Sequence, residues 1–226
     1  MIATRRTGSN LLLGYLNSIP NTSFAQEILN KHMSYGVRDR WVSKAAVLRH
    51  IAYSINHCEH RICGAKLLRF QLEAHRITLQ DLKTFFPRAR FIILYRRSIL
   101  GQFVSLKTAE LTGQWLWTED YKLPSSIHIE TRAFEEYCGI IKAFYGNVFE
   151  HDWIRHCSVT LSYEDLAADP QKVFDETLFP FLNLPSSKVS CRLRKQNTKE
   201  PREIIANYHE IEPLVEYEWT RQAYPA

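Results

Sequence analysis

The sequence lacks several features that would place it in a specialised class of protein. No apolar run approaches the roughly 18 residues of a membrane span, and no apolar signal region follows Arg5 and Arg6. The five cysteines show neither C-x-x-C nor Cys/His ligand spacing, so we expect reduced thiols, no disulfide framework and no metal site. These absences favour a cytoplasmic protein that is not exported by a Sec-type signal.

A strong charge imbalance is also missing. The 226 residues carry 29 Lys+Arg and 24 Asp+Glu, a formal net charge of +5, and 45% are hydrophobic. This length and composition predict a single globular domain spanning residues 1–226, with ample material for a core. A surplus of this size does not by itself indicate nucleic-acid binding, so the placement of the charge matters more than its amount.

The basic residues gather in three places. They are the Arg5-Arg6 pair, a stretch from Lys83 to Arg97 that contains no acid, and a stretch from Lys188 to Arg202 that contains one. Each cluster taken alone is compatible with a solvated surface. Two of the clusters differ from an ordinary solvated surface in their positions relative to the expected strands.

The hydrophobic pattern predicts a three-layer α/β fold with a mainly parallel central sheet. Its clearest strand is Phe91–Tyr95, which is apolar without alternation, as expected when both faces of a parallel strand are covered. We also expect strands at residues 2–4, 62–67 and 159–163, and helices at 11–16, 43–56, 78–86, 99–111, 129–149 and 171–182. Ligands of such sheets bind beyond the carboxyl ends of the strands, where Arg5-Arg6 and Arg96-Arg97 are expected to lie. Two basic pairs at one edge indicate a site for an anion with more than one phosphate-like group.

The turn from Thr4 to Leu12 places backbone amides, hydroxyls and an arginine at the start of a helix, where the helix dipole favours an anion. It is not a Walker A loop, because no Gly-Lys-Ser/Thr occurs at the required spacing. The alternative is a tight turn before a buried helix. A second element follows the strongest strand: Arg97 and Ser105 are eight residues apart and are expected to reach one phosphate.

Together these motifs resemble the PAPS-dependent sulfotransferases. Arg6-Thr7-Gly8-Ser9-Asn10-Leu11-Leu12 matches their 5'-phosphosulfate loop, except that Arg5 stands where proline is usual, and Arg97 with Ser105 matches their 3'-phosphate motif. The likeness is closer to the bacterial trehalose 2-sulfotransferase branch. Further counterparts occur in similar order at Gln26-Glu27, Gly64–Leu67, Gln102, Val104-Ser105, Thr112–Trp115, Tyr163–Leu166 and Arg194–Gln196.

This resemblance implies a P-loop NTPase-like sulfotransferase fold. It also implies PAPS (3'-phosphoadenosine 5'-phosphosulfate) as sulfuryl donor and PAP (3'-phosphoadenosine 5'-phosphate) as product, with no metal. The donor-binding residues that it implies are Arg5, Arg6, Thr7, Gly8, Ser9, Asn10, Arg97, Ser105, Tyr163, Arg194 and Lys195. Alternatively, Tyr163 is an ordinary tyrosine at a strand end, and Arg194 and Lys195 lie on a solvated loop.

Glu27 is the general base that the resemblance implies, with Arg6 and Lys66 as the other catalytic residues. A glutamate near the donor sulfur can accept a hydroxyl proton. The alternatives are that Glu27 is a carboxylate at the N-terminus of a helix beginning before Ile28, and that Lys66 only extends its ammonium from a strand end.

The expected acceptor is a hydroxyl of a carbohydrate or another small molecule. Trp115, Trp117 and Tyr121 are candidates for stacking on a sugar ring, although aromatic residues at this spacing also serve as core. We expect no nucleic-acid partner and no membrane span, and the oligomeric state stays open between monomer and homodimer. The rival functions are a phosphate-loop kinase, a non-catalytic anion-binding or nucleic-acid-binding module, and a family member that binds the donor without activity.

Overall fold

The computed structural model describes residues 1–33, 36–37, 43–115, 124–193 and 200–215. Of the residues singled out above, Trp117, Tyr121, Arg194 and Lys195 lie outside the described residues. In the described part of the chain, no helix is both long and apolar enough to cross a membrane.

The central sheet is parallel, as predicted. Its strands are β1 (Ile2–Ala3), β4 (Leu67–Leu68), β5 (Phe91–Tyr95) and β6 (Ser158–Ser162), in the order β4-β1-β5-β6. All five residues of β5 are buried, which explains why its sequence does not alternate. A separate parallel pair is formed by β2 (Thr22–Ala25) and β3 (Ile62–Ala65).

The strand expected at residues 62–67 is divided at Lys66. Its first part, β3, pairs with β2, and its second part, β4, pairs with β1. The sequence pattern did not predict β2, because Thr22–Ala25 is short and only two of its four residues are buried. The division places Lys66 at the junction of the two sheets, where its side chain is 1% exposed.

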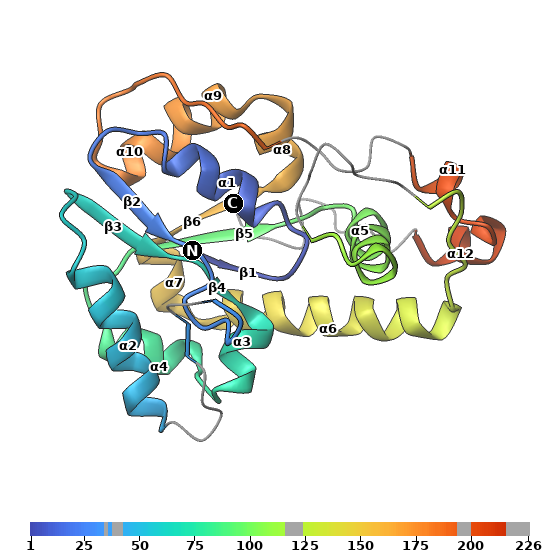
Figure 1. Ribbon diagram of the computed structural model, residues 1–226, viewed down its shortest axis with the longest axis horizontal. Coiled ribbons are helices and arrows are strands. Elements are labelled where there is room, and N and C mark those ends of the chain that lie inside the picture. Colours follow the sequence, from blue (N-terminus) through green and yellow to red (C-terminus); the bar gives the residue numbers. More distant parts are fainter. Residues whose placement is uncertain (34–35, 38–42, 116–123, 194–199, 216–226) are drawn as a thin grey trace.

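Helices cover both faces of the sheet, which gives three layers (Figure 1). In β5, Ile92 and Leu94 pack toward α1 and α8–α10, whereas Phe91, Ile93 and Tyr95 belong to the core beneath α2–α7. The helices are α1 (Ser9–Leu16), α2 (Lys44–Asn56), α3 (Arg69–Ala74), α4 (Leu79–Phe85), α5 (Ile99–Thr112), α6 (Thr131–Glu150), α7 (Asp152–Cys157), α8 (Tyr163–Ala168), α9 (Pro170–Val173), α10 (Phe179–Leu182), α11 (Pro201–Ile204) and α12 (Tyr208–Val215). The predicted three-layer α/β fold is therefore confirmed.

Helix boundaries follow the capping signals in the sequence. The side chains of Ser43, Thr78, Ser98 and Asp169 each accept a hydrogen bond from a backbone amide in the first turn of the following helix. The helix expected at residues 171–182 begins at Pro170. It contains a π-helical segment, η1 (Phe174–Leu178), between α9 and α10.

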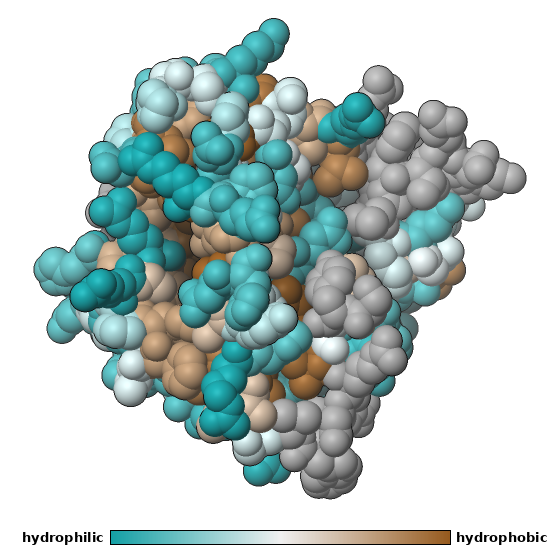
Figure 2. Space-filling view, turned by 60° about the vertical axis from the view of Figure 1, so that its left-hand side comes forward, coloured by the Kyte–Doolittle hydropathy of each residue, from teal (hydrophilic) through white to brown (hydrophobic). Residues whose placement is uncertain are grey.

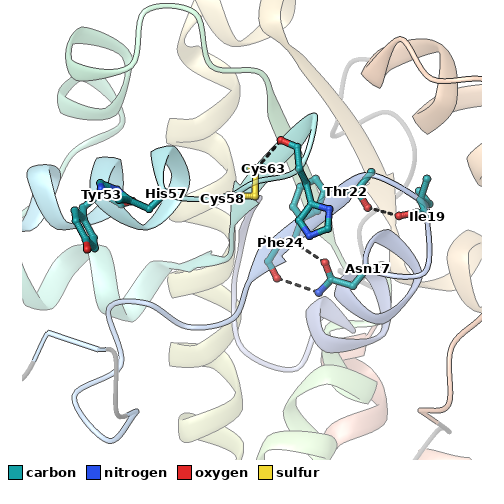
Figure 3. The surroundings of a disulfide bond; sticks show 9 residues. Asn17, Ile19, Thr22, Phe24, Tyr53, His57, Cys58 and Cys63 are labelled. Carbon is teal, nitrogen blue, oxygen red and sulfur yellow. Dashed lines mark hydrogen bonds between the residues drawn. A yellow bond between two sulfur atoms is a disulfide. The ribbon is translucent and has the colours of Figure 1, made fainter.

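The expectation of reduced thiols throughout is wrong for one pair of cysteines. Cys58 and Cys63 form a disulfide with a Cα–Cα distance of 6.1 Å, within the usual range (Figure 3). The pairing arises because the connection from the end of α2 to the start of β3 is short, which brings the two residues together. Among the described residues Cys138, Cys157 and Cys191 are free thiols.

Candidate active site

The candidate phosphate loop connects β1 to α1 at the carboxyl edge of the sheet. Arg6 and Gly8 adopt left-handed backbone conformations, with φ of 64° and 78°. A Cβ at Gly8 would lie 2.3 Å from Cδ2 of Tyr163, so both the backbone angle and the close aromatic ring require glycine there. The turn presents the first amides of α1 at its end, which is the geometry of an anion site.

A buried polar cluster fixes the start of this loop. The Tyr145 hydroxyl lies 3.3 Å from both the backbone nitrogen and Oγ1 of Thr4, and it donates to the Leu94 carbonyl at 2.6 Å. The Gln102 amide donates to Thr4 Oγ1 at 2.8 Å and to the Arg5 carbonyl at 2.5 Å. The loop is thereby held by α5 and α6. Sequence reasoning did not assign this role to either residue, because the tertiary fold alone brings them to Thr4.

Arg6 points toward α5. Its Nε donates to Ser105 Oγ at 2.9 Å, and its Nη1 donates to the Trp115 carbonyl at 2.8 Å. Ser105 was expected to act together with Arg97. Within the described residues no hydrogen bond joins those two side chains, and Ser105 contacts the loop arginine instead.

Arg97 is bound to the segment that follows β6. Its guanidinium donates to both carboxylate oxygens of Asp165 at 3.0 Å, and its backbone amide donates to Glu164 at 2.9 Å. The amide of Ser98 donates to the other oxygen of Glu164 at 3.1 Å. Glu164 and Asp165 thus join the carboxyl ends of β5 and β6, and the Arg97 side chain remains 33% exposed.

Tyr163 lies between the candidate phosphate loop and the Arg96-Arg97 pair. Its ring covers Gly8 on one side, and the Arg96 guanidinium lies 4.6 Å from the ring centroid. Arg96 also donates to the Arg6 carbonyl at 3.3 Å. The two basic pairs of the sequence therefore meet at one edge of the sheet, as the strand pattern predicted.

Glu27 and Lys66 form an ion pair beside the phosphate loop. Lys66 Nζ lies 3.0 Å from Glu27 Oε1 and also donates to the side-chain oxygen of Asn10. Burial lowers the pKa of the Lys66 ammonium, and the neighbouring Glu27 carboxylate opposes this shift. The Glu27 side chain is 23% exposed, so this carboxylate keeps access to the site.

Two amides hold the second carboxylate oxygen of Glu27. Gln71 Nε2 and Asn30 Nδ2 donate to Oε2 at 3.0 and 2.9 Å. Sequence reasoning did not identify either amide, because neither lies in a recognisable motif. Glu27 follows β2 and is not part of a helix, so the alternative of a carboxylate at a helix N-terminus is wrong.

The fold is that of the sulfotransferases, as the motifs predicted. A solved sulfotransferase from Alicyclobacillus acidocaldarius superposes with a TM-score of 0.52 at 15% identity, and the alignment covers 96% of each chain. Nodulation protein H of Rhizobium meliloti is 26% identical over 93% of this chain and 88% of its own. Nodulation protein H of Rhizobium tropici is 24% identical over 93% of this chain and 86% of its own. No family model matches the chain.

Proposed function

We propose that this protein transfers a sulfuryl group from PAPS to a hydroxyl of a carbohydrate or another small molecule. The observation that carries the proposal is the chain of contacts from Glu27 through Lys66 to Asn10. It places a carboxylate and an ammonium beside the loop that has the geometry of an anion site. These contacts support the proposal, because sulfuryl transfer needs a proton acceptor and a charge stabiliser near the donor sulfur.

Donor binding would use the loop from Arg5 to Asn10. The amides at the start of α1 and the Arg6 guanidinium would hold the 5'-phosphosulfate, because a guanidinium and helix N-terminal amides both favour an anionic oxygen. As the bridging S–O bond breaks, negative charge builds on the phosphate of PAP. Arg6 and Lys66 would stabilise that charge in the transition state.

The 3'-phosphate would bind near Arg97, with Tyr163 beside the adenosine and Ser105, Arg194 and Lys195 as further ligands. The bidentate pair with Asp165 supports this assignment, because it holds the Arg97 guanidinium at the sheet edge in a geometry that also suits phosphate. The 3'-phosphate would then either displace the Asp165 carboxylate from the Arg97 guanidinium or share the guanidinium with it. This contact is remote from the sulfur and supplies binding energy for positioning.

Glu27 would act as general base. An ionised carboxylate offers about four lone-pair positions. Lys66, Gln71 and Asn30 occupy three in the structure, which leaves one for an acceptor hydroxyl. The hydroxyl oxygen forms the new S–O bond, its proton passes to Glu27, and PAP leaves with the electrons of the old bond. The exposed ring of Trp115, whose carbonyl binds Arg6, would flank the acceptor.

Two measurements test the proposal. Calorimetry should detect PAP binding in buffer that contains EDTA, and Arg6→Ala should weaken it at least tenfold. Arg132→Ala is the matched control, because Arg132 lies on the exposed face of α6 and pairs only with Glu136 among the described residues. Unaltered PAP affinity in Arg6→Ala would contradict the assignment.

The second measurement follows transfer of labelled sulfate from PAPS to a panel of sugars. Glu27→Gln should lower kcat by roughly 100-fold or more while PAP affinity stays within about threefold, because general-base catalysis contributes about 10²–10⁴-fold. Equal turnover in the Glu27→Gln protein would exclude Glu27 as the base, and magnesium-dependent ATP turnover would favour a kinase.

A further inference from the structure

The side chains of Arg5 and Arg6 diverge, although the two residues are adjacent in the chain. Arg6 reaches α5 and its end, where it donates to Ser105 Oγ and to the Trp115 carbonyl. The Arg5 guanidinium instead lies over the ring of Phe70 in α3, with its Cζ 5.1 Å from the ring centroid. The phosphate loop therefore directs one arginine toward α5 and the other toward α3.

Helix α3 links the Arg5 side chain to Glu27. Phe70 stacks with the Arg5 guanidinium, and the next residue, Gln71, donates to Glu27 Oε2 at 3.0 Å. A single turn of α3 thus holds both the arginine and the carboxylate. Arg5 is therefore placed to contact a second group of an acceptor whose hydroxyl binds Glu27.

Three arginines act on one buried hydroxyl near this turn. The Tyr137 hydroxyl of α6 is buried and has no hydrogen-bond partner among the described residues. Burial raises its pKa and Tyr145 adds to the rise, whereas the positive charges of Arg5, Arg96 and Arg69 oppose it. The three guanidinium groups are thus close together, and they make this side of the site positive.

Carboxylates accompany two of these three arginines. Arg69 pairs with Glu73 at 2.9 Å, and Arg96 Nε lies 4.0 Å from a carboxylate oxygen of Glu164. Arg5 is exposed, and it forms no hydrogen bond or ion pair with any residue that the structure describes. The unbalanced positive charge is therefore that of one guanidinium, whose planar set of donors suits a carboxylate.

A cavity elsewhere on the molecule does not serve the acceptor. It has a volume of about 700 Å³ and is lined by parts of α2, β3 and the start of β5. Figure 2 shows an apolar hollow framed by hydrophilic residues on the face toward the viewer. Neither Glu27 nor Lys66 is among the described residues that line the cavity. Recognition of the acceptor therefore depends on side chains close to Glu27.

We propose that the Arg5 guanidinium binds a carboxylate of the acceptor, so that the preferred acceptor is a sugar acid rather than a neutral sugar. The proposal rests on the proposed sulfuryl transfer and names the class of its acceptor. Two parallel N–H···O bonds from the stacked guanidinium fix the carboxylate, and Arg69 adds positive potential. Lys66 neutralises Glu27, so the base does not repel an acidic acceptor.

This anchor also has a consequence for positioning. The carboxylate binds away from the reacting hydroxyl, and the sugar ring between them is held at two points, Arg5 and Glu27. Such two-point binding orients the hydroxyl toward the donor sulfur. A neutral sugar lacks the first contact, so it binds more weakly and in several orientations.

The test measures binding of matched sugars to the PAP-loaded full chain by calorimetry. The probes are the methyl glycoside of glucuronic acid and its primary amide, which share every hydroxyl and differ in charge. We expect the acid to bind at least tenfold more tightly than the amide, because hydrogen bonds to a charged group are the stronger ones. PAP should not displace the acid, because the Arg5 side chain points away from Arg6.

Variants of Arg5 assign the preference to its guanidinium. Arg5→Gln should weaken binding of the acid at least tenfold while the amide changes by less than about threefold, whereas a general disturbance of the loop weakens both probes alike. Arg5→Lys keeps the charge and should retain part of the preference. Arg132→Gln is the matched control, because this exposed arginine of α6 pairs only with Glu136 among the described residues.

Five results would overturn the proposal. They are no saturable binding of the acid at millimolar concentration, equal affinity for acid and amide, a preference that persists in Arg5→Gln, displacement of the acid by PAP, and tighter binding of methyl glucoside 6-phosphate than of the acid. Failure of the chain to bind PAP would instead refute the proposed function. The comparison of acid with amide, repeated without PAP, still reports on Arg5 in that case.

Discussion

At the scale of single residues, Lys66 joins the two halves of the candidate site. Its ammonium is almost fully buried between the loop residue Asn10 and the carboxylate of Glu27. Glu27 is more exposed and has two further donors, Gln71 and Asn30. The two partners therefore depend on the ion pair to different degrees.

This asymmetry predicts unequal losses of stability. Glu27→Leu leaves a buried ammonium with Asn10 alone, and we expect its free energy of unfolding to fall by about 3 kcal/mol. Lys66→Met leaves a partly exposed carboxylate that keeps both amide donors, so its loss should be clearly smaller. Urea unfolding of the two variants measures the difference, and equal losses would contradict the asymmetry.

Gly8 is a second residue whose replacement should cause a measurable loss of stability. Gly8→Ala places a methyl group at φ 78° and into the Tyr163 ring, so we expect about 1–2 kcal/mol of destabilisation and a loss of PAP affinity. In the double variant with Tyr163→Ala the steric clash disappears but the backbone strain remains, so stability should recover only in part. Chemical denaturation measures the stability of each variant, and titration with PAP measures its affinity. Complete recovery of stability in the double variant would exclude backbone strain at residue 8.

The sequence could predict residues whose role depends on local geometry. Arg6 and Gly8 lie in a turn between a strand and a helix, a pattern that predicts either an anion site or a tight turn before a buried helix. Gln71 and Tyr145 could not be found in this way, because their contacts with Glu27 and Thr4 exist only after distant segments pack. Likewise, the spacing of Arg97 and Ser105 did not reveal that Ser105 contacts Arg6.

At the scale of elements, helix α4 begins with a capping box formed by Thr78 and Asp81, and its contribution to stability depends on pH. The hydrogen bond from Lys44 at 2.8 Å is the largest factor lowering the pKa of Asp81 from 3.8 to about 2, and the Thr78 amide adds to it. The folded pKa lies below the unfolded one, so this stabilisation is present above about pH 4 and is lost as the pH falls toward 2.

Unfolding measured across this pH range tests the capping box. Asp81→Asn should show a weaker decrease in unfolding free energy between pH 4 and 2 than the unaltered chain. Lys44→Met should lie between the two, because the Thr78 amide still binds Asp81. If the unfolding free energies of all three proteins fall in parallel between pH 4 and 2, Asp81 is not the source of the pH dependence.

A buried hydroxyl of the long helix α6, that of Tyr145, hydrogen-bonds to the central sheet. Tyr145→Phe removes the donor to the Leu94 carbonyl and the contact with Thr4, so we expect a loss of about 1–3 kcal/mol, the cost of unsatisfied buried groups. PAP affinity should also fall, because Thr4 begins the phosphate loop. Tyr137→Phe is the control on the same helix, since no described partner binds its hydroxyl.

Elements with strong local signals were predictable, and those defined by pairing were not. Phe91–Tyr95 and the capped helices follow from apolar pattern and caps. β2 and the division at Lys66 depend on which strands become neighbours, and the Cys58–Cys63 disulfide depends on the turn between α2 and β3. None of these three features has a periodic signature.

At the scale of the whole molecule, a hydrophobic core on each face of the four-stranded sheet supports the candidate site along its carboxyl edge. The order of helical and strand patterns was sufficient to predict this architecture and the edge at which the basic pairs meet. It did not predict that the sheet is divided into two, because register and strand order arise from contacts between segments far apart in the chain.

Because the strand pairing changes at Lys66, the two parts of the candidate site lie on different sheets. The four-stranded sheet carries the phosphate loop, whereas the β2–β3 ribbon leads directly to Glu27. If the proposed function is correct, the buried ion pair between Glu27 and Lys66 would hold the base in place relative to the donor. Under the proposed function, local opening of the β2–β3 ribbon would stop sulfuryl transfer and leave the proposed nucleotide-binding loop folded, so a variant that stays folded and binds PAP could still be inactive.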